Sequence, residues 1–257
     1  MSKMKKHEIE AAISEGVKNM NLSHRKELLP FIFEDLGIQE YYDAFDAHDD
    51  RFYVLGTPVE TYHNKSHMQS VALNCYEALH STLTEFEKDD KRALMIAAIY
   101  HDFKHLHVAE HDYLNISMAL KSLDEVHNNV KHKVEPKIYA KICKLIQHTE
   151  YPYVVVSTNI RDPLSHILRD SDLMMIYEKD EEAIKMYRGL FVELNLKHRH
   201  NELPELTFDE FVSRNTKFLQ KVEWNSRWAR NKAFMLNFPK RVKDMHTVLS
   251  NLAIAEV

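Results

Sequence analysis

Glycine is rare in this chain, with 4 residues among 257, and neither Asn-Gly nor Asp-Gly occurs. Those two dipeptides are the usual sequences of tight hairpin turns, and sheets need many residues that adopt turn conformations. The composition therefore favours helices. We expect an all-α bundle that forms a single domain over residues 1–257, and we expect the one strand-like run, residues 151–159, to form a loop.

Helix boundaries follow from apolar residues repeated every three to four positions and from capping residues. Gly37 is placed to end a helix, Asp162 with Pro163 to begin one, and Thr207 with Glu210 to form a capping box. Residues 51–60 are expected to form a loop. The predicted helices cover residues 5–20, 24–36, 40–49, 61–83, 89–102, 112–126, 135–149, 162–176 and 180–195, with two or three more in the C-terminal third, interrupted near Pro239.

Bulk composition restricts partners and compartment. The net charge is −5, so the chain lacks the broad positive field that double-stranded nucleic acid attracts. Cys75 and Cys143 lie in apolar helical patterns and are expected to be core thiols, which favours a reducing, cytoplasmic setting. The N-terminus lacks the apolar segment of a secretory signal, and no run of about 18 apolar residues is present, so we expect no membrane span.

Histidines and carboxylates stand beside apolar helical sequence in several places. His63 and His67 are one helical turn apart, so one could bind a metal while the other faces a substrate, or both could be surface histidines. His101 and Asp102 follow a strongly apolar helix, and this pair suits a divalent metal. The alternative is a histidine that interacts with the helix dipole.

Two further carboxylates, Asp170 and Asp172, lie within an apolar stretch. Their partner could be Arg169 rather than a metal. Burying ionisable groups costs free energy unless they are paired or bound to a metal. Several such places, far apart in the sequence, suggest one metal site that folding assembles.

The order His, then His-Asp, then Asp resembles the HD superfamily of metal-dependent phosphohydrolases over about residues 60–235. Residues 62–67, Tyr-His-Asn-Lys-Ser-His, are similar to the first signature of class I cyclic nucleotide phosphodiesterases, and residues 101–105, His-Asp-Phe-Lys-His, to the second. Other segments resemble small bacterial and phage HD phosphohydrolases of unassigned substrate: residues 98–102, Asn115, Ser117, residues 169–173 and Ala229-Arg230-Asn231.

The resemblance implies an HD helical bundle whose core, residues 60–180, carries the metal site, with residues 1–50 as a helical extension and extra C-terminal helices. It makes His67, His101, Asp102 and Asp172 the metal ligands, with Asp172 chosen because the second Asp of this motif is the usual ligand. These side chains suit one or two ions of Mn, Mg, Fe, Co, Ni or Zn. His63 then corresponds to the general acid.

Further residues are expected around the substrate. His105 would lie near the phosphate or a metal-bound water. Lys104, His148 and Arg230 are expected to bind the substrate, although Arg230 could also be an ordinary charge on a helix face. Two features depart from the phosphodiesterase pattern. His107 stands where those enzymes have a glycine, and the Gln and Phe that hold the purine have no obvious counterpart.

We therefore expect a hydrolase that uses metal-activated water on a phosphoester of a nucleotide or cyclic-nucleotide-like substrate, with catalytic residues His63, His105 and Asp102. Two alternatives stay open. One is a non-catalytic HD module that binds metal or nucleotide as a sensor or assembly part. The other is a hydrolase of (deoxy)nucleotide mono- or triphosphates rather than of cyclic phosphodiesters.

Overall fold

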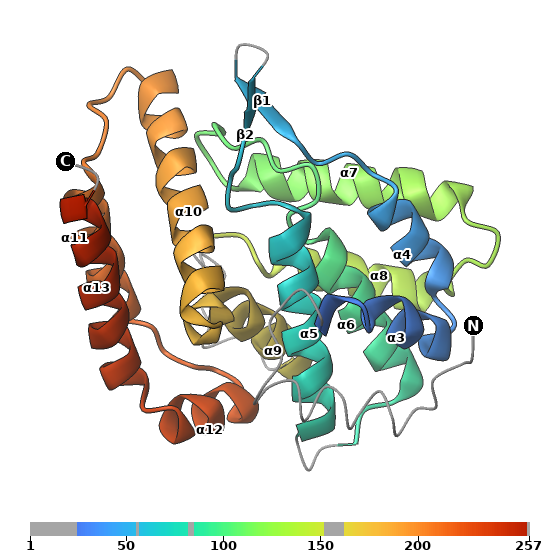
Figure 1. Cartoon of the computed structure of the whole chain (residues 1–257). Helices are drawn as coiled ribbons and strands as arrows, with labels where there is room; N and C mark the ends of the chain where they lie inside the picture. Colours follow the sequence, from blue (N-terminus) through green and yellow to red (C-terminus); the bar gives the residue numbers. More distant parts are fainter. Residues whose placement is uncertain (1–24, 55–56, 82–84, 152–161, 256–257) are drawn as a thin grey trace.

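The computed structural model describes residues 25–54, 57–81, 85–151 and 162–255. These residues form the predicted all-α bundle, with one small hairpin added (Figure 1). The elements are α3 (Leu29–Leu36), α4 (Gln39–Asp46), β1 (Phe52–Val54), β2 (Thr57–Val59), α5 (Lys65–Ser81), α6 (Lys88–Tyr100), α7 (Tyr113–Asn129), α8 (Pro136–Gln147), α9 (Pro163–Asp172), the 3₁₀ turn η1 (Leu173–Tyr177), α10 (Asp180–His200), α11 (Phe208–Leu219), α12 (Arg227–Met235) and α13 (Phe238–Ala255).

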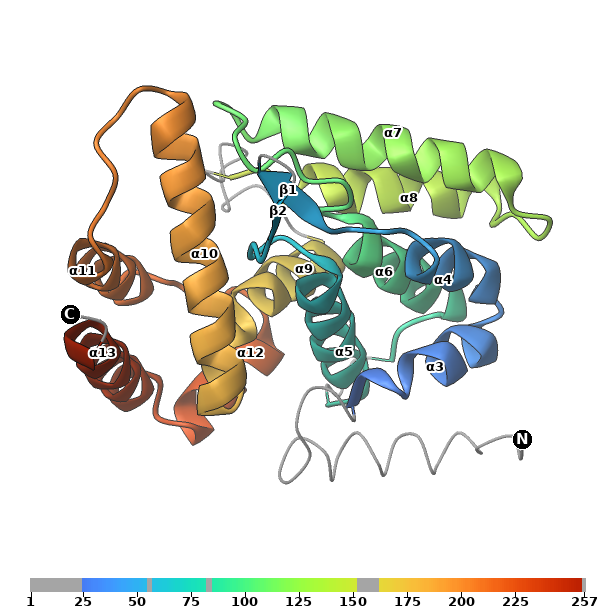
Figure 2. The same ribbon diagram turned by 45° about the horizontal axis from the view of Figure 1, so that its top comes forward.

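Helix α6 lies at the centre of the bundle. Every residue from Ala93 to Tyr100 is fully buried, as the apolar sequence predicts. Helices α3, α4, α5, α7, α8 and α9 all contact α6. Figure 2 shows α10 to α13 on the opposite side of α5 and α9 from α3 and α4. One hydrophobic cluster extends from Leu28 to Leu249, so the C-terminal helices share the core that α6 organises.

Three predicted capping signals are confirmed. Gly37 follows α3 in the left-handed conformation, with φ 70°, and its N–H donates to the carbonyl of Glu34. A residue without a Cβ adopts this conformation at little cost. The Asp162 side chain accepts a hydrogen bond from the Leu164 N–H at the start of α9. The capping box of Thr207 and Glu210 is present at the start of α11.

The expected loop over residues 51–60 is wrong, because β1 and β2 pair antiparallel within it. Pro58 is opposite Tyr53, in a two-stranded ribbon where a missing N–H is tolerated. The helix expected from residue 61 begins only at Lys65, since the Asn64 side chain accepts the His67 N–H (3.0 Å) and so caps α5.

The predictions of a helix over residues 5–20 and a loop over 151–159 fall outside the described residues, except for Tyr151, a bend. Among the helices that the structure describes, none combines the length and the apolar character needed to cross a bilayer. Cys75 is buried, Cys143 is half-buried, and both are free thiols.

Candidate metal centre and the adjoining cavity

Four ionisable side chains from three parts of the sequence meet in one place. His67 lies in the first turn of α5, His101 and Asp102 follow the end of α6, and Asp172 ends α9. One ligand atom from each lies within 4.8 Å of the others. His67 Nε2 is 3.0 Å from a carboxylate oxygen of Asp172, and His101 Nε2 is 3.0 Å from one of Asp102. The closest contacts of the Asp172 carboxylate are with histidines and not with Arg169, the alternative partner.

The two imidazoles are held as a metal would need them. Both side chains are almost fully buried, and neither Nε2 atom has a hydrogen-bond partner. Nδ1 of His101 donates to the carbonyl oxygen of Ala98 (2.9 Å), so the lone pair of the neutral ring is on Nε2, beside the carboxylates. Fixing one ring nitrogen in this way orients the other as a ligand. Two imidazoles and two carboxylates without a thiolate fit a divalent cation.

The close approach of these groups to one another also shifts pKa values within the site. Burial raises the pKa of Asp102 and of Asp172, but the neighbouring histidines outweigh it and hold both pKa values below the ordinary range. Burial lowers the pKa of His101, but the two carboxylates outweigh it and hold the pKa well above its usual value. A cation bound here would take the place of a proton.

A second cluster, formed by His63, His105 and Glu193, adjoins the first. Glu193 on α10 is buried and accepts hydrogen bonds from Nδ1 of His63 and from the His63 backbone N–H (3.3 Å). The rings of His63 and His105 stack, with centroids 3.9 Å apart and planes 18° apart. A ring nitrogen's lone pair lies in the ring plane, so two stacked imidazoles do not converge on one ion. The stacked rings are therefore poorly oriented to share a second cation.

The two stacked histidines have opposite protonation behaviour. Burial lowers the pKa of His63, but the carboxylates of Glu193 and Asp102 outweigh it and raise the pKa to about 9. Burial and the nearby charge of His63 lower the pKa of His105 to about 3. His63 Nε2 lies 3.8 Å from an oxygen of Asp102, so a proton held on His63 borders the candidate metal centre.

Sequence reasoning did not find Glu193. It is one of several acidic residues on α10, and nothing in its neighbours distinguishes it from a solvated charge. Its place depends on Gly189, one turn earlier. A Cβ at Gly189 would lie 2.9 Å from the carbonyl carbon of Thr61 and 3.0 Å from Tyr62 N. Helix α10 therefore touches the backbone just before His63, which brings Glu193 onto the His63 ring.

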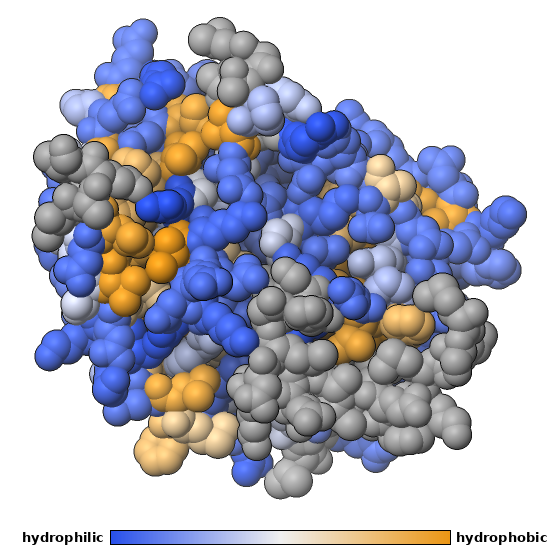
Figure 3. Space-filling model, viewed as in Figure 1, coloured by the Kyte–Doolittle hydropathy of each residue, from blue (hydrophilic) through white to orange (hydrophobic). Residues whose placement is uncertain are grey.

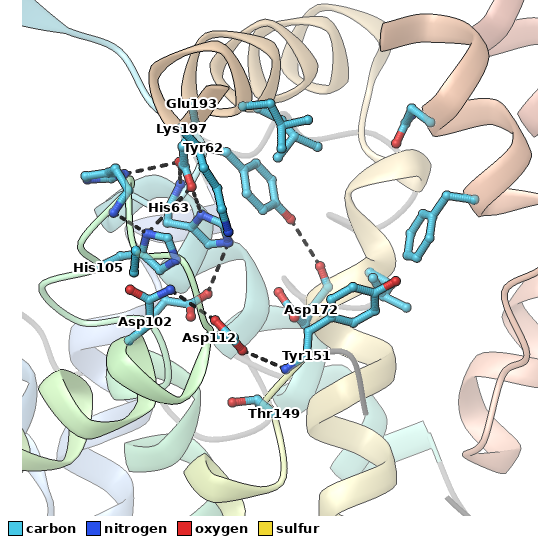
Figure 4. Close-up of a pocket in the computed structure, with 18 of the residues that line it drawn as sticks. Tyr62, His63, Asp102, His105, Asp112, Thr149, Tyr151, Asp172, Glu193 and Lys197 are labelled. Carbon is cyan, nitrogen blue, oxygen red and sulfur yellow. Dashed lines mark hydrogen bonds and ion pairs between the residues drawn. The ribbon is translucent and has the colours of Figure 1, made fainter. Parts of the chain in front are cut away.

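Both clusters adjoin a cavity of about 960 Å³. Figure 4 shows Glu193, His63, His105 and Asp102 on one side of it, with Asp172 across from them. The apolar wall comes from η1, α10 and α11 and includes Met175, Leu190, Leu194, Phe211 and Phe218. Figure 3 shows hydrophobic residues gathered on the face over α10 and α11. Such a site, mostly apolar with polar groups at one end, is typical of small-molecule binding.

Helix α11 also brings an amide and an aromatic ring to the cavity. Asn215 and Phe218 are three residues apart and both line it. The ring of Phe218 meets that of Tyr151 edge to face, with centroids 6.1 Å apart. Sequence reasoning did not single out either residue, because an isolated Asn and Phe on an amphipathic helix carry no distinguishing signal.

The three predicted substrate-binding residues are not among the cavity-lining residues. Lys104 is exposed, with Nζ 3.4 Å from a carboxylate oxygen of Glu125. His148 is half-buried, and its Nδ1 is 2.7 Å from the hydroxyl of Ser165. Arg230 is exposed and donates to backbone carbonyls near the start of α12. Their positions give no support to direct substrate contact, because each side chain is directed to a partner elsewhere.

Asp170, the rejected ligand candidate, has a separate role. It is buried and accepts the backbone N–H groups of Asn225 (3.1 Å) and Ser226 (2.6 Å). It therefore holds the segment before α12. His107 and His111 both line the cavity. His107 is buried against Glu193, whereas His111 is exposed.

The fold is that of solved phosphodiesterase domains. The phosphodiesterase domain of the RhoPDE fusion protein from the choanoflagellate Salpingoeca rosetta matches with a TM-score of 0.64 and 14% sequence identity, covering 98% of this chain and 93% of that chain. The phosphodiesterase domain of Salpingoeca rosetta rhodopsin phosphodiesterase matches with a TM-score of 0.64 and 15% identity, covering 98% and 90%. No protein-family model and no curated protein sequence matches the chain.

Proposed function

We propose that this chain is a metal-dependent phosphohydrolase of the HD type that cleaves a phosphoester in a nucleotide. One observation carries the proposal. The candidate ligands of a divalent metal and a histidine that carries a proton both border a cavity sized for a small molecule. His63 Nε2 lies 3.8 Å from Asp102, so the two groups are adjacent. A metal that activates water and an acid that protonates the leaving oxygen are two ways in which phosphoester hydrolysis is accelerated.

His67, His101, Asp102 and Asp172 would hold the metal. When bound, a divalent cation lowers the pKa of a water molecule toward neutrality and offsets charge on the phosphoryl oxygens. Asp102 is the ligand closest to the second cluster, with one oxygen near both His101 and His63. It therefore fixes the distance between the phosphoryl group and the acid.

His63 would protonate the departing alkoxide oxygen. Nδ1 of His63 donates a hydrogen bond to the Glu193 carboxylate, so Nε2 is the nitrogen that carries the transferable proton. The same contact fixes the ring and stabilises its charged form, as a general acid requires. His105, stacked on His63 and neutral, would donate a hydrogen bond to a phosphoryl oxygen rather than a proton.

The walls of the cavity favour a nucleotide. Phe218 and Tyr151 present ring faces and edges on which a base could pack, and Asn215 offers an amide donor and acceptor to its edge. Base stacking on an aromatic ring tolerates different bases. The similarity to phosphodiesterase domains, which is a likeness of fold, favours a phosphodiester over the mono- or triphosphates, and a cyclic nucleotide is the phosphodiester that the sequence signatures indicate.

A metal analysis combined with a substrate panel tests the proposal. The purified chain is analysed for bound metals and assayed with Mn²⁺ against cyclic nucleotides, nucleoside monophosphates and nucleoside triphosphates. We expect metal in the purified protein and turnover of the cyclic substrates. Turnover of only the mono- or triphosphates would favour the second hydrolase class. Metal without turnover of any substrate would favour the non-catalytic binding module.

A further inference from the structure

The short segment that carries His105 has an unusual backbone. Among the described residues, four non-glycine positions have positive φ: Lys104, His107, Glu202 and Asn237. Two of these, Lys104 at 59° and His107 at 55°, lie on either side of His105. A side chain makes this region of backbone conformation unfavourable. Such conformations persist only where the surroundings enforce them, and they cluster at functional sites.

The contacts of His107 with its neighbours show what enforces its positive φ. The residue is buried, and its Nδ1 lies 3.2 Å from an oxygen of Glu193, the carboxylate that also binds His63. Its ring meets that of His105 in a T-shaped contact, with centroids 5.2 Å apart. His107 therefore contacts two members of the second cluster at once. No other described side chain outside that cluster is within ion-pair distance of Glu193.

The backbone of His107 determines the tautomer of His105. The His107 N–H donates to Nδ1 of His105 over 3.0 Å. A nitrogen that accepts a hydrogen bond carries a lone pair, so in the neutral ring the proton is on Nε2. His105 lines the cavity, and its Nε2–H is then the donor that remains for a ligand. The positive φ of His107 sets the direction of its side chain relative to that N–H, and the ring then lies against Glu193.

We propose that His107 is a positioning residue: its N–H and its ring fix His105 and Glu193, so that His105 presents a protonated Nε2 to a phosphoryl oxygen of the substrate. The catalytic role of His105 rests on the proposed function, whereas the tautomer of its ring does not. His107 stands where the phosphodiesterase pattern has glycine; a glycine there would keep the N–H but would lack the ring that contacts Glu193.

Three substitutions separate positioning from structural support. His107→Gly keeps a residue that tolerates positive φ but removes the ring. His107→Asn also tolerates positive φ and places an amide nitrogen near the position of Nδ1, within reach of Glu193. Glu202→Gly is the matched control, because Glu202 is exposed, has φ 55° and lies outside the cavity lining. All three are compared with the full-length protein by thermal unfolding and by steady-state kinetics with Mn²⁺.

We expect His107→Gly to unfold at the same or a higher temperature, because the strained φ is relieved, while kcat falls roughly 10–100-fold with little change in KM. His107→Asn should recover most of the lost kcat. Glu202→Gly should leave kcat and KM unchanged. Wild-type kcat in His107→Gly, or equal loss in both His107 variants together with a lowered Tm, would overturn the proposal, since the second result describes a residue that only supports the fold.

The tautomer is read directly by ¹⁵N NMR of histidine rings on Zn²⁺-loaded protein, with the His105 signals identified by their loss in His105→Gln. We expect a protonated Nε2 and an unprotonated Nδ1 in the wild type, and a mixture of tautomers in His107→Gly because its loop is freed. A proton on Nδ1 in the wild type, or one unchanged tautomer in His107→Gly, refutes the positioning role. If no substrate is turned over but these signals are as expected, the hydrolase function fails while the positioning of His105 holds.

Discussion

A carboxylate oxygen of Asp172, the last residue of α9, lies 3.0 Å from Nε2 of His67 in the first turn of α5. Neither atom has an arginine or lysine in its closest contacts, and the His67 nitrogen lacks a hydrogen-bond partner. The contact joins the two ends of the candidate donor set. It also separates Asp172 from Asp170, two residues earlier, whose carboxylate faces the start of α12.

Replacing each aspartate tests this division. Asp172→Asn should abolish stoichiometric metal binding, because the site loses one of its two anionic ligands. Asp170→Asn should keep the metal but lower the free energy of unfolding by about 1–3 kcal/mol, since it weakens hydrogen bonds to buried N–H groups. Elemental analysis and thermal unfolding measure the two effects. Retention of metal by Asp172→Asn and its loss in Asp170→Asn would reverse the assignment.

Metal binding should weaken as the pH falls. The carboxylates hold the pKa of His101 well above its usual value, so near neutrality the metal-free site carries a proton that a cation must displace. Affinity therefore rises with pH until His101 is unprotonated without metal. Isothermal titration calorimetry with Mn²⁺ in buffers of different ionisation enthalpy should detect proton release. An affinity and a heat that do not depend on pH and buffer would contradict this.

Glu193→Gln should slow the chemical step and leave substrate binding nearly unchanged. The carboxylate raises the pKa of His63, and an amide in its place lets that pKa fall. A general acid is active while protonated, so the alkaline limb of the kcat profile should move to lower pH. At neutral pH kcat should fall roughly 100-fold, at the lower end of what acid–base groups contribute, while KM changes little. An unshifted alkaline limb would show that His63 is not the acid.

Gly189→Ala should damage both stability and activity. Alanine favours helices, yet its Cβ would overlap the backbone of Thr61 and Tyr62. We expect a loss of about 1–3 kcal/mol in the free energy of unfolding, as for other overpacked sites, together with reduced kcat because Glu193 moves from His63. Lys185→Ala, on the exposed side of α10, is the control. A Gly189→Ala protein more stable than wild type would disprove the close approach.

Phe218→Ala tests where the base lies. Stacking on an aromatic ring contributes about 1–3 kcal/mol per base, so KM for a nucleotide should rise roughly 5- to 100-fold with kcat changed less. Phe234→Ala is the matched control, because Phe234 is 88% exposed and is not among the cavity-lining residues. Equal KM values for the two variants would place the base elsewhere in the cavity.

The sequence alone determined the helical class and many of the helix ends. Scarce glycine, apolar periodicity and local caps such as Asp162 act within a few residues, so they can be read in order along the chain. The cost of burying imidazoles and carboxylates in apolar helices suggested one shared metal site. The resemblance of the sequence to the HD superfamily then selected the four residues that meet there, with Asp172 rather than Asp170.

Only the tertiary structure brought Glu193 to His63, His107 to Glu193, and Asn215 with Phe218 to the cavity. It also directed Lys104, His148 and Arg230 to other partners. These contacts join helices and loops distant in sequence, and each depends on how closely two backbones approach, as at Gly189. Interhelical distance is set by packing of the whole core, which no local pattern of residues records.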